Sequence, residues 1–127
     1  MSGVARSSLH GCRILVVEDE YFLADELAQA LQEDGAEVLG PVARVADALP
    51  LIRDEEQIDG ALLDVNLAGE MVWPAVEALL ARSVPIMLAT GYDDKSIPPV
   101  YAHLPRVEKP LELRALLRTL RHELRPD

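Results

Sequence analysis

Short apolar runs alternate with longer amphipathic segments along most of the chain. Five runs are typical of buried β-strands: residues 13–17, 36–42, 58–64, 85–89 and 106–108. Helices are predicted at 22–31, 43–53, 73–82 and 111–124, and in the first and last of these leucines recur every three or four residues. Residues 93–103 contain Pro98 and Pro99, which leave room only for a short or distorted helix. This alternation predicts a parallel sheet covered by helices on both faces.

The number of strands also restricts their order. Right-handed crossovers and five strand–helix units favour a flavodoxin-like, three-layer α/β sandwich with strand order 2-1-3-4-5. In that order the connections reverse direction between the first and third strands, and ligands bind outside the carboxyl ends of the strands at that point. The 127 residues suffice for one domain, which we expect over 13–127, after a flexible tail at 1–12.

Charge and composition exclude several classes of function. The sum of 12 basic and 22 acidic residues is −10, which argues against nucleic acid and against an anionic membrane surface as partners. One cysteine, Cys12, excludes an internal disulfide and a four-cysteine zinc site. The sequence shows neither a signal-peptide pattern nor an apolar stretch long enough to span a membrane. We therefore expect a soluble cytoplasmic protein, monomeric or weakly dimeric.

Carboxylates follow two of the strands that border the predicted crevice. Glu18 and Asp19 come directly after the first strand, and Asp64 ends the third. Because the carboxyl ends of parallel strands meet at one edge of the sheet, these three acids are expected to converge. Three close carboxylates repel one another, and a hard divalent cation relieves that repulsion. The sequence therefore predicts a Mg²⁺ site, to which the backbone carbonyl of Asn66 would add a ligand.

The last two strands bring a hydroxyl and an ammonium to the same edge. Thr90 follows the fourth strand, and Lys109 follows the fifth. Three acids, one lysine and one Mg²⁺ sum to zero charge, and such a site can accept a phosphoryl group. Asp64 would be the nucleophile and would form an aspartyl phosphate. Lys109 would neutralise the phosphoryl oxygens and Thr90 would donate a hydrogen bond to them.

Four short motifs in this order resemble the receiver domain of two-component response regulators, the CheY-like fold. They are VVEDE at 16–20, LLDVN at 62–66, ATGY at 89–92 and EKP at 108–110, and the resemblance runs from about residue 13 to residue 124. It implies that Asp64 is the phosphoacceptor, that Thr90 is the switch hydroxyl and that Lys109 contacts the phosphoryl group. It also implies that Glu18, Asp19, Asp64 and the Asn66 carbonyl bind Mg²⁺.

A narrower resemblance concerns residues 84–110, which look like the stand-alone receivers of alphaproteobacteria named for their FATGUY motif. Leu88 stands where that motif has phenylalanine. The resemblance implies a single-domain regulator in a phosphorelay, loaded by a sensor histidine kinase or a histidine phosphotransfer protein. Its output would be a change in protein contacts or service as a phosphate sink. It would catalyse only its own phosphorylation and dephosphorylation, so we do not expect an enzyme acting on other substrates.

One position departs from the family pattern. Receivers usually carry an aromatic side chain three residues before the lysine, and here that residue is Arg106. We hypothesise that Tyr92 takes part of the aromatic role. Tyr92 and Asn66 flank the expected phosphoryl site and are predicted to tune the lifetime of the phosphorylated form.

Three other functions remain open from the residues alone. A receiver-fold adaptor that is never phosphorylated is one, although the complete set of site residues argues against it. A small Mg²⁺-dependent phosphohydrolase with an aspartyl nucleophile is another, but such enzymes usually carry a second acid where this chain has Asn66. A flavin carrier fits least, because the acidic loop EDEYF has no glycine to cradle a phosphate.

Overall fold

The central sheet of the computed structural model has five parallel strands. The structure describes residues 8–91 and 97–125. Along the sheet the strands lie in the order β2 (Glu37–Val42), β1 (Arg13–Val17), β3 (Gly60–Asp64), β6 (Ile86–Thr90) and β7 (Arg106–Glu108). Each neighbouring pair is parallel. This is the predicted 2-1-3-4-5 order, so the flavodoxin-like architecture is confirmed.

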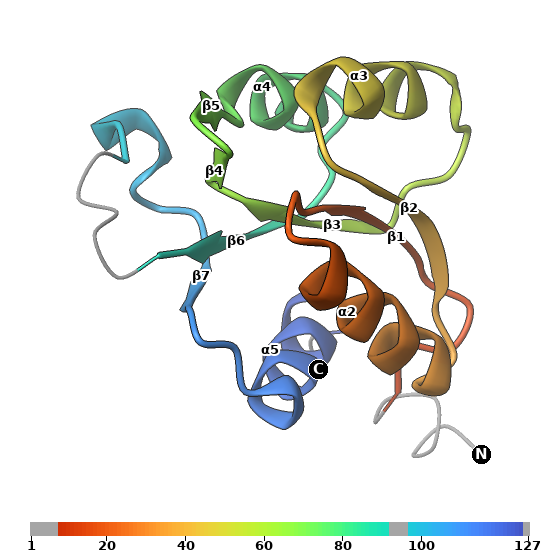
Figure 1. Cartoon of the computed structure of the whole chain (residues 1–127). Helices are drawn as coiled ribbons and strands as arrows, with labels where there is room; N and C mark the ends of the chain where they lie inside the picture. The colour runs from red at the N-terminus through yellow and green to blue at the C-terminus, as the bar shows by residue number, and fades with distance from the viewer. Residues whose placement is uncertain (1–7, 92–96, 126–127) are drawn as a thin grey trace.

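Helices cover both faces of the sheet, as Figure 1 shows. α2 (Tyr21–Glu33) and α5 (Leu113–Leu124) lie on one face, and α3 (Val45–Asp54) and α4 (Trp73–Ala81) lie on the other. Side chains alternate along β1: Ile14 and Val16 belong to the core under α2 and α5, whereas Leu15 and Val17 belong to the core under α3 and α4. The apolar run of β1 therefore serves two cores at once, which is why it shows no polar alternation. Within the described residues, no helix is long and apolar enough to cross a membrane.

The fourth helical region is short, as predicted. It is a single 3-10 turn, η1 (Pro99–Tyr101), before which Pro98 lies in an extended conformation. Pro98 and Pro99 lack backbone N–H groups, so an α-helix cannot run through them without losing hydrogen bonds. η1 lies on the same side of the sheet as α4.

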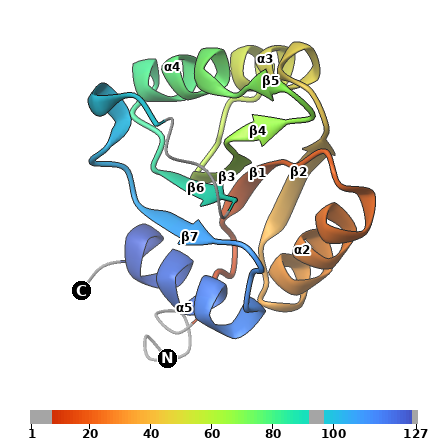
Figure 2. The same cartoon turned by 60° about the vertical axis from the view of Figure 1, so that its left-hand side comes forward.

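A two-stranded hairpin after β3 was not predicted. β4 (Asn66–Leu67) and β5 (Glu70–Met71) pair in antiparallel fashion, and Figure 2 shows this hairpin between the sheet and the helices α3 and α4. Its turn residues, Ala68 and Gly69, both have positive φ, and the side-chain oxygen of Asn66 accepts a hydrogen bond from the Gly69 N–H at 2.7 Å. The available sequence signal was Asn66 with Gly69 three residues later, two residue types that are common in turns.

The end of the predicted tail packs against the domain. Leu9 is fully buried in the core under α2 and α5, and Cys12 is buried beside it. The Leu9 N–H donates to the backbone carbonyl and to a carboxylate oxygen of Asp34, at 3.1 and 2.9 Å. An isolated leucine between polar residues carries no periodicity, so sequence patterns do not reveal this contact.

Candidate functional site

Three polar side chains are buried in the described part of the chain, and all three lie at the carboxyl ends of strands. Glu18 follows β1, Asp64 ends β3 and Thr90 ends β6. The order β1-β3-β6 makes these strand ends neighbours. Every other buried side chain among the described residues is hydrophobic. Burial of polar groups is unfavourable unless they are paired. This cluster of buried polar side chains therefore indicates a functional site rather than a part of the hydrophobic core.

Lys109 joins two of the acids. Its Nζ lies 2.6 Å from Asp64 Oδ2 and 3.1 Å from Glu18 Oε1. The backbone N–H of Lys109 donates to the Thr90 carbonyl at 2.8 Å, which extends the β6–β7 pairing and fixes the position of the lysine. The sequence prediction that Asp64, Glu18, Thr90 and Lys109 gather at one edge is therefore matched by their positions.

The acids outnumber the lysine. Carboxylate oxygens of Glu18, Asp19 and Asp64 all lie within 4.8 Å of one another. Three carboxylates and one ammonium leave a formal charge of −2. Glu18 Oε1 is also buried without a hydrogen bond of good geometry, despite its closeness to Lys109. A cluster of oxygen donors with excess negative charge and an unsatisfied oxygen fits a hard divalent cation such as Mg²⁺.

The electrostatics of the site shift two pKa values. Burial raises the pKa of Glu18 to about 7, and the neighbouring Asp64 adds to the rise, against the hydrogen bonds from Glu20 and Lys109. For Lys109, burial works to lower the pKa, but hydrogen bonds to Asp64 and Glu18 outweigh it and raise the pKa above its usual value. The rise at Glu18 is thus mainly the cost of burying a charge, whereas the rise at Lys109 comes from its two carboxylate partners.

Asn66 and Thr90 have defined partners. The Asn66 N–H donates to Asp64 Oδ1 at 3.1 Å, so the hairpin that follows β3 orients the Asp64 carboxylate. The Thr90 hydroxyl donates to the Val107 carbonyl at 3.3 Å. The predicted metal contact of the Asn66 carbonyl and the predicted switch role of Thr90 stay predictions.

The two residues predicted to tune the switch differ in their outcome. Tyr92 lies outside the described residues. Arg106 is exposed on β7, and its guanidinium donates to the Ala102 carbonyl at 2.8 Å, at the end of η1. Sequence reasoning missed a buried aromatic residue in this region, Tyr101, which stacks on Trp73 of α4. The sequence signal that could have revealed Tyr101 was the position of an aromatic residue just before a turn, five residues ahead of Arg106.

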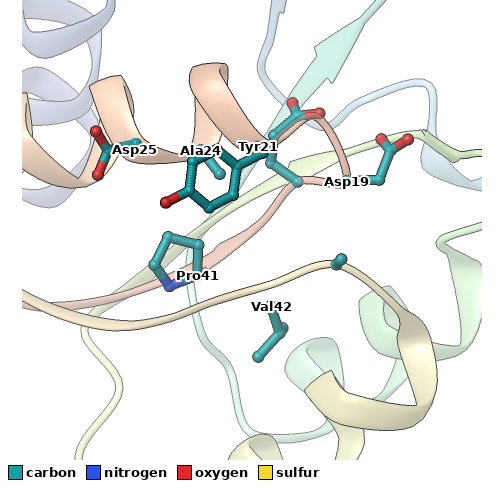
Figure 3. Close-up of a pocket in the computed structure, with 8 residues that line it drawn as sticks. Asp19, Tyr21, Ala24, Asp25, Pro41 and Val42 are labelled. Carbon is teal, nitrogen blue, oxygen red and sulfur yellow. The ribbon is translucent and has the colours of Figure 1, made fainter.

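A cleft opens beside the acids, between the start of α2 and the end of β2. It encloses about 200 Å³ and is lined by Asp19, Tyr21 and Pro41 among others. Figure 3 shows the Tyr21 ring above Pro41, with Asp19 farther along the α2 side of the cleft. Gly40 precedes the lining residue Pro41 in β2; its φ is +93°, and an added Cβ would lie 2.8 Å from the Val42 nitrogen. Only glycine adopts this backbone conformation of β2 without strain.

Comparison with known proteins places these features in one family. No family model and no curated protein matches the chain. Among solved structures, SdrG from Sphingomonas melonis Fr1 is 38% identical over 86% of this chain and 92% of its own, with a TM-score of 0.76. The receiver domain of the TMAO respiratory system response regulator TorR is 30% identical over 87% and 94%, with a TM-score of 0.75.

A CheY-like receiver domain protein from Methanospirillum hungatei JF-1 is 27% identical over 89% of this chain and 93% of its own, with a TM-score of 0.77. These three similarities span nearly the whole length of each compared protein. They agree with the five-stranded parallel architecture described above. The chain belongs to the receiver-domain family of two-component response regulators.

Proposed function

We propose that the chain is a single-domain response regulator that accepts a phosphoryl group on Asp64. The donor would be a phosphohistidine of a sensor kinase or of a histidine phosphotransfer protein. The observation that carries this proposal is the environment of Asp64: a buried carboxylate with one oxygen 2.6 Å from Lys109 Nζ, inside a cluster of two further acids. Such an arrangement supplies a nucleophile and the positive charge that a phosphoryl group needs.

The reaction is a transfer between two side chains. An Asp64 oxygen attacks phosphorus, the O–P bond forms, and the P–N bond breaks with its electron pair returning to the imidazole of the donor. The Asn66 N–H holds Asp64 Oδ1 and the Lys109 ammonium holds Oδ2, so the carboxylate is oriented before the donor arrives. Lys109 then neutralises a phosphoryl oxygen.

Glu18, Asp19, Asp64 and the Asn66 carbonyl would hold Mg²⁺, which supplies charge neutralisation to the transferred group when bound. Thr90 would exchange its hydrogen bond to the Val107 carbonyl for one to a phosphoryl oxygen. That exchange shifts the balance between two conformations of the chain and so changes its protein contacts. The same residues would promote hydrolysis of the aspartyl phosphate, with Asn66 and Tyr92 setting its rate. We propose no activity on other substrates.

A relative supports this proposal. SdrG has been described in a BeF3-activated conformation, and that structure is 38% identical to this chain with a TM-score of 0.71. Beryllofluoride has the shape and charge of a phosphoryl group attached to a carboxylate. We expect Asp64 of this chain to bind the same analogue.

Intact mass after incubation with Mg²⁺ and acetyl phosphate tests the proposal. We expect the wild-type chain to gain one phosphoryl group, and Asp64→Asn to gain none. Asp47→Asn is the matched control, because Asp47 is an exposed aspartate on α3, and it should label like the wild type. Omission of Mg²⁺ should abolish labelling. The proposal fails if Asp64→Asn is labelled as the wild type is, or if the wild type stays unlabelled where another receiver is labelled.

A further inference from the structure

Two aromatic rings stack where η1 meets α4. The ring centroids of Trp73 and Tyr101 are 4.9 Å apart and the rings are inclined by 14°. Tyr101 is buried, and its hydroxyl donates a hydrogen bond to the carboxylate of Glu77. Trp73 and Glu77 are four residues apart on α4 and therefore share one face of that helix. The same helix thus holds Tyr101 by its ring and by its hydroxyl. We name Trp73, Glu77 and Tyr101 the aromatic clasp.

The clasp is tied on one side to Asp64. Trp73 is the first residue of α4, and Val72 before it donates its N–H to the Val65 carbonyl at 3.1 Å. Val65 directly follows Asp64, and the hairpin between them and α4 begins with Asn66, whose N–H bonds the Asp64 carboxylate. A new charge and volume at Asp64 would therefore act on the start of α4 through a short series of backbone contacts.

The clasp is tied on its other side to the strand that ends in Thr90. The Tyr101 carbonyl accepts a hydrogen bond from the Leu104 N–H at 3.1 Å. The next residue, Pro105, accepts one from the Leu88 N–H of β6 at 2.9 Å. β6 ends two residues later at Thr90. Tyr101 is thus connected to both residues whose surroundings a phosphoryl group would change, Asp64 and Thr90.

We propose that the aromatic clasp couples the phosphoryl state of Asp64 to the position of η1. Position 106, where receivers usually carry an aromatic side chain, holds an arginine in this chain. The inference rests on the proposed function. In this inference the closed clasp stabilises the unphosphorylated conformation. Coupling between two sites is reciprocal, so loosening the clasp raises the affinity of Asp64 for a phosphoryl analogue. Val100, which is 65% exposed on η1, then presents a surface to partners that differs between the two states.

The test uses beryllofluoride with Mg²⁺ as the probe. Bound beryllofluoride is detected by ¹⁹F NMR, and the state of the clasp is read from the fluorescence of Trp73, the single tryptophan of the chain. We expect wild-type fluorescence to change on binding. Tyr101→Leu should lose that change and bind beryllofluoride about fivefold more tightly or better, the lower range of measured coupling between sites. Val100→Ala, on the same turn but exposed, should bind as the wild type does.

A second variant separates the two contacts of Tyr101 and guards against misfolding. Tyr101→Phe keeps the stack and removes the hydrogen bond to Glu77, so it should bind with an intermediate affinity. It carries the comparison alone if circular dichroism shows that Tyr101→Leu does not fold. Two results together would overturn the clasp inference: equal affinities in all folded variants, and unchanged Trp73 fluorescence while ¹⁹F NMR shows bound probe. The clasp would then contribute only to packing, and the proposed function would stand. Absence of bound probe in the wild type would overturn the proposed function, and the clasp inference with it.

Discussion

The two ends of the central sheet are closed in opposite ways. At the carboxyl ends of the strands, Glu18, Asp64 and Thr90 are buried, and Lys109 is the one cation among the described residues that pairs with Glu18 and Asp64. At the amino ends, Leu9 is fully buried, and an added Cβ on Gly60 would lie 2.8 Å from a methyl group of Leu124. The carboxyl end buries excess negative charge, and the amino end supplies apolar packing. The difference teaches that apolar packing and buried charge are concentrated at opposite ends of the strands, so the apolar end can be weakened without altering the acids.

The largest expected effect is on stability at the amino end. Leu9→Ala should lower the free energy of unfolding by about 2–5 kcal/mol, the range for truncating a buried leucine, and leave labelling of Asp64 unchanged. Urea denaturation measures the first and intact mass the second. Leu49→Ala, at a partly exposed position, should cost well under half as much. If both variants cost the same, residues 8–12 would belong to a tail and the contrast between the two ends would disappear.

A smaller effect is expected at the carboxyl end. Lys109→Met removes the only cation that contacts Asp64 and Glu18 in the described residues, and leaves both carboxylates buried and unpaired. The free energy of unfolding without Mg²⁺ should fall by about 1–3 kcal/mol, and added Mg²⁺ should restore more of it in the variant than in the wild type. Arg118→Met on the exposed side of α5 is the control. Equal stability of Lys109→Met and wild type in the absence of metal would show that the excess charge costs nothing.

The pH dependence of stability should have an unusual sign at this end. The pKa of Glu18 is raised from 4.5 when unfolded to about 7 in the fold, so the folded chain binds the extra proton. The resulting stabilisation is complete below pH 4.5 and is lost as the pH rises through about 7. Without Mg²⁺ the contribution of Glu18 to the free energy of unfolding should therefore rise as the pH falls from about 7 towards 4.5, by at most about 1.4 kcal/mol per pH unit.

The Glu18→Gln variant isolates this contribution. Its amide does not titrate, so the difference in stability between variant and wild type should shrink as the pH falls below about 7. Denaturation curves at several pH values in a chelating buffer measure it. A constant difference across that range would mean that Glu18 titrates at its ordinary pKa and that its burial is compensated.

The smallest expected effect concerns an ion pair at the amino end. The Arg121 guanidinium binds the Asp34 carboxylate with two hydrogen bonds, across 87 residues of sequence. A double-mutant cycle with Arg121→Ala and Asp34→Ala should give a coupling of about 0.5–1 kcal/mol that weakens with salt, because the pair is partly exposed. Arg114→Ala serves as the matched control on the same helix. A coupling near zero would assign the stability of this end to apolar packing alone.

Sequence patterns predicted the sheet and the site because both depend on local signals. Apolar runs as long as β1 and β3 are visible without any tertiary information. The parallel order then brings the residues after each run to one edge, so Asp64, Thr90 and Lys109 could be placed together. The predicted Mg²⁺ site then followed from charge, since a cation relieves the repulsion between clustered acids.

The remaining features depend on contacts between distant residues. The Trp73–Tyr101 stack and the Arg121–Asp34 pair join segments 28 and 87 residues apart and leave no periodic trace. The β4–β5 hairpin has strands of two residues, which are too short for any period to show. Tertiary packing decides the stack, the ion pair and the place of Leu9 in the core, whereas the hairpin is local and only Asn66 and Gly69 indicate it.

The hydrogen bond from the Arg125 guanidinium to the His10 carbonyl joins residues 115 positions apart. Residue 125 therefore lies beside residue 10 at the amino end of the sheet, away from Asp64. A short linker between these two neighbourhoods would close the fold into a ring, and the ring could be reopened in an exposed loop as a circular permutant. Fluorescent proteins or output modules could then be attached at new positions around the receiver while the strand pairing and the acids stay in place. The closeness of residues 10 and 125 thus makes this receiver fold suitable for circular permutation.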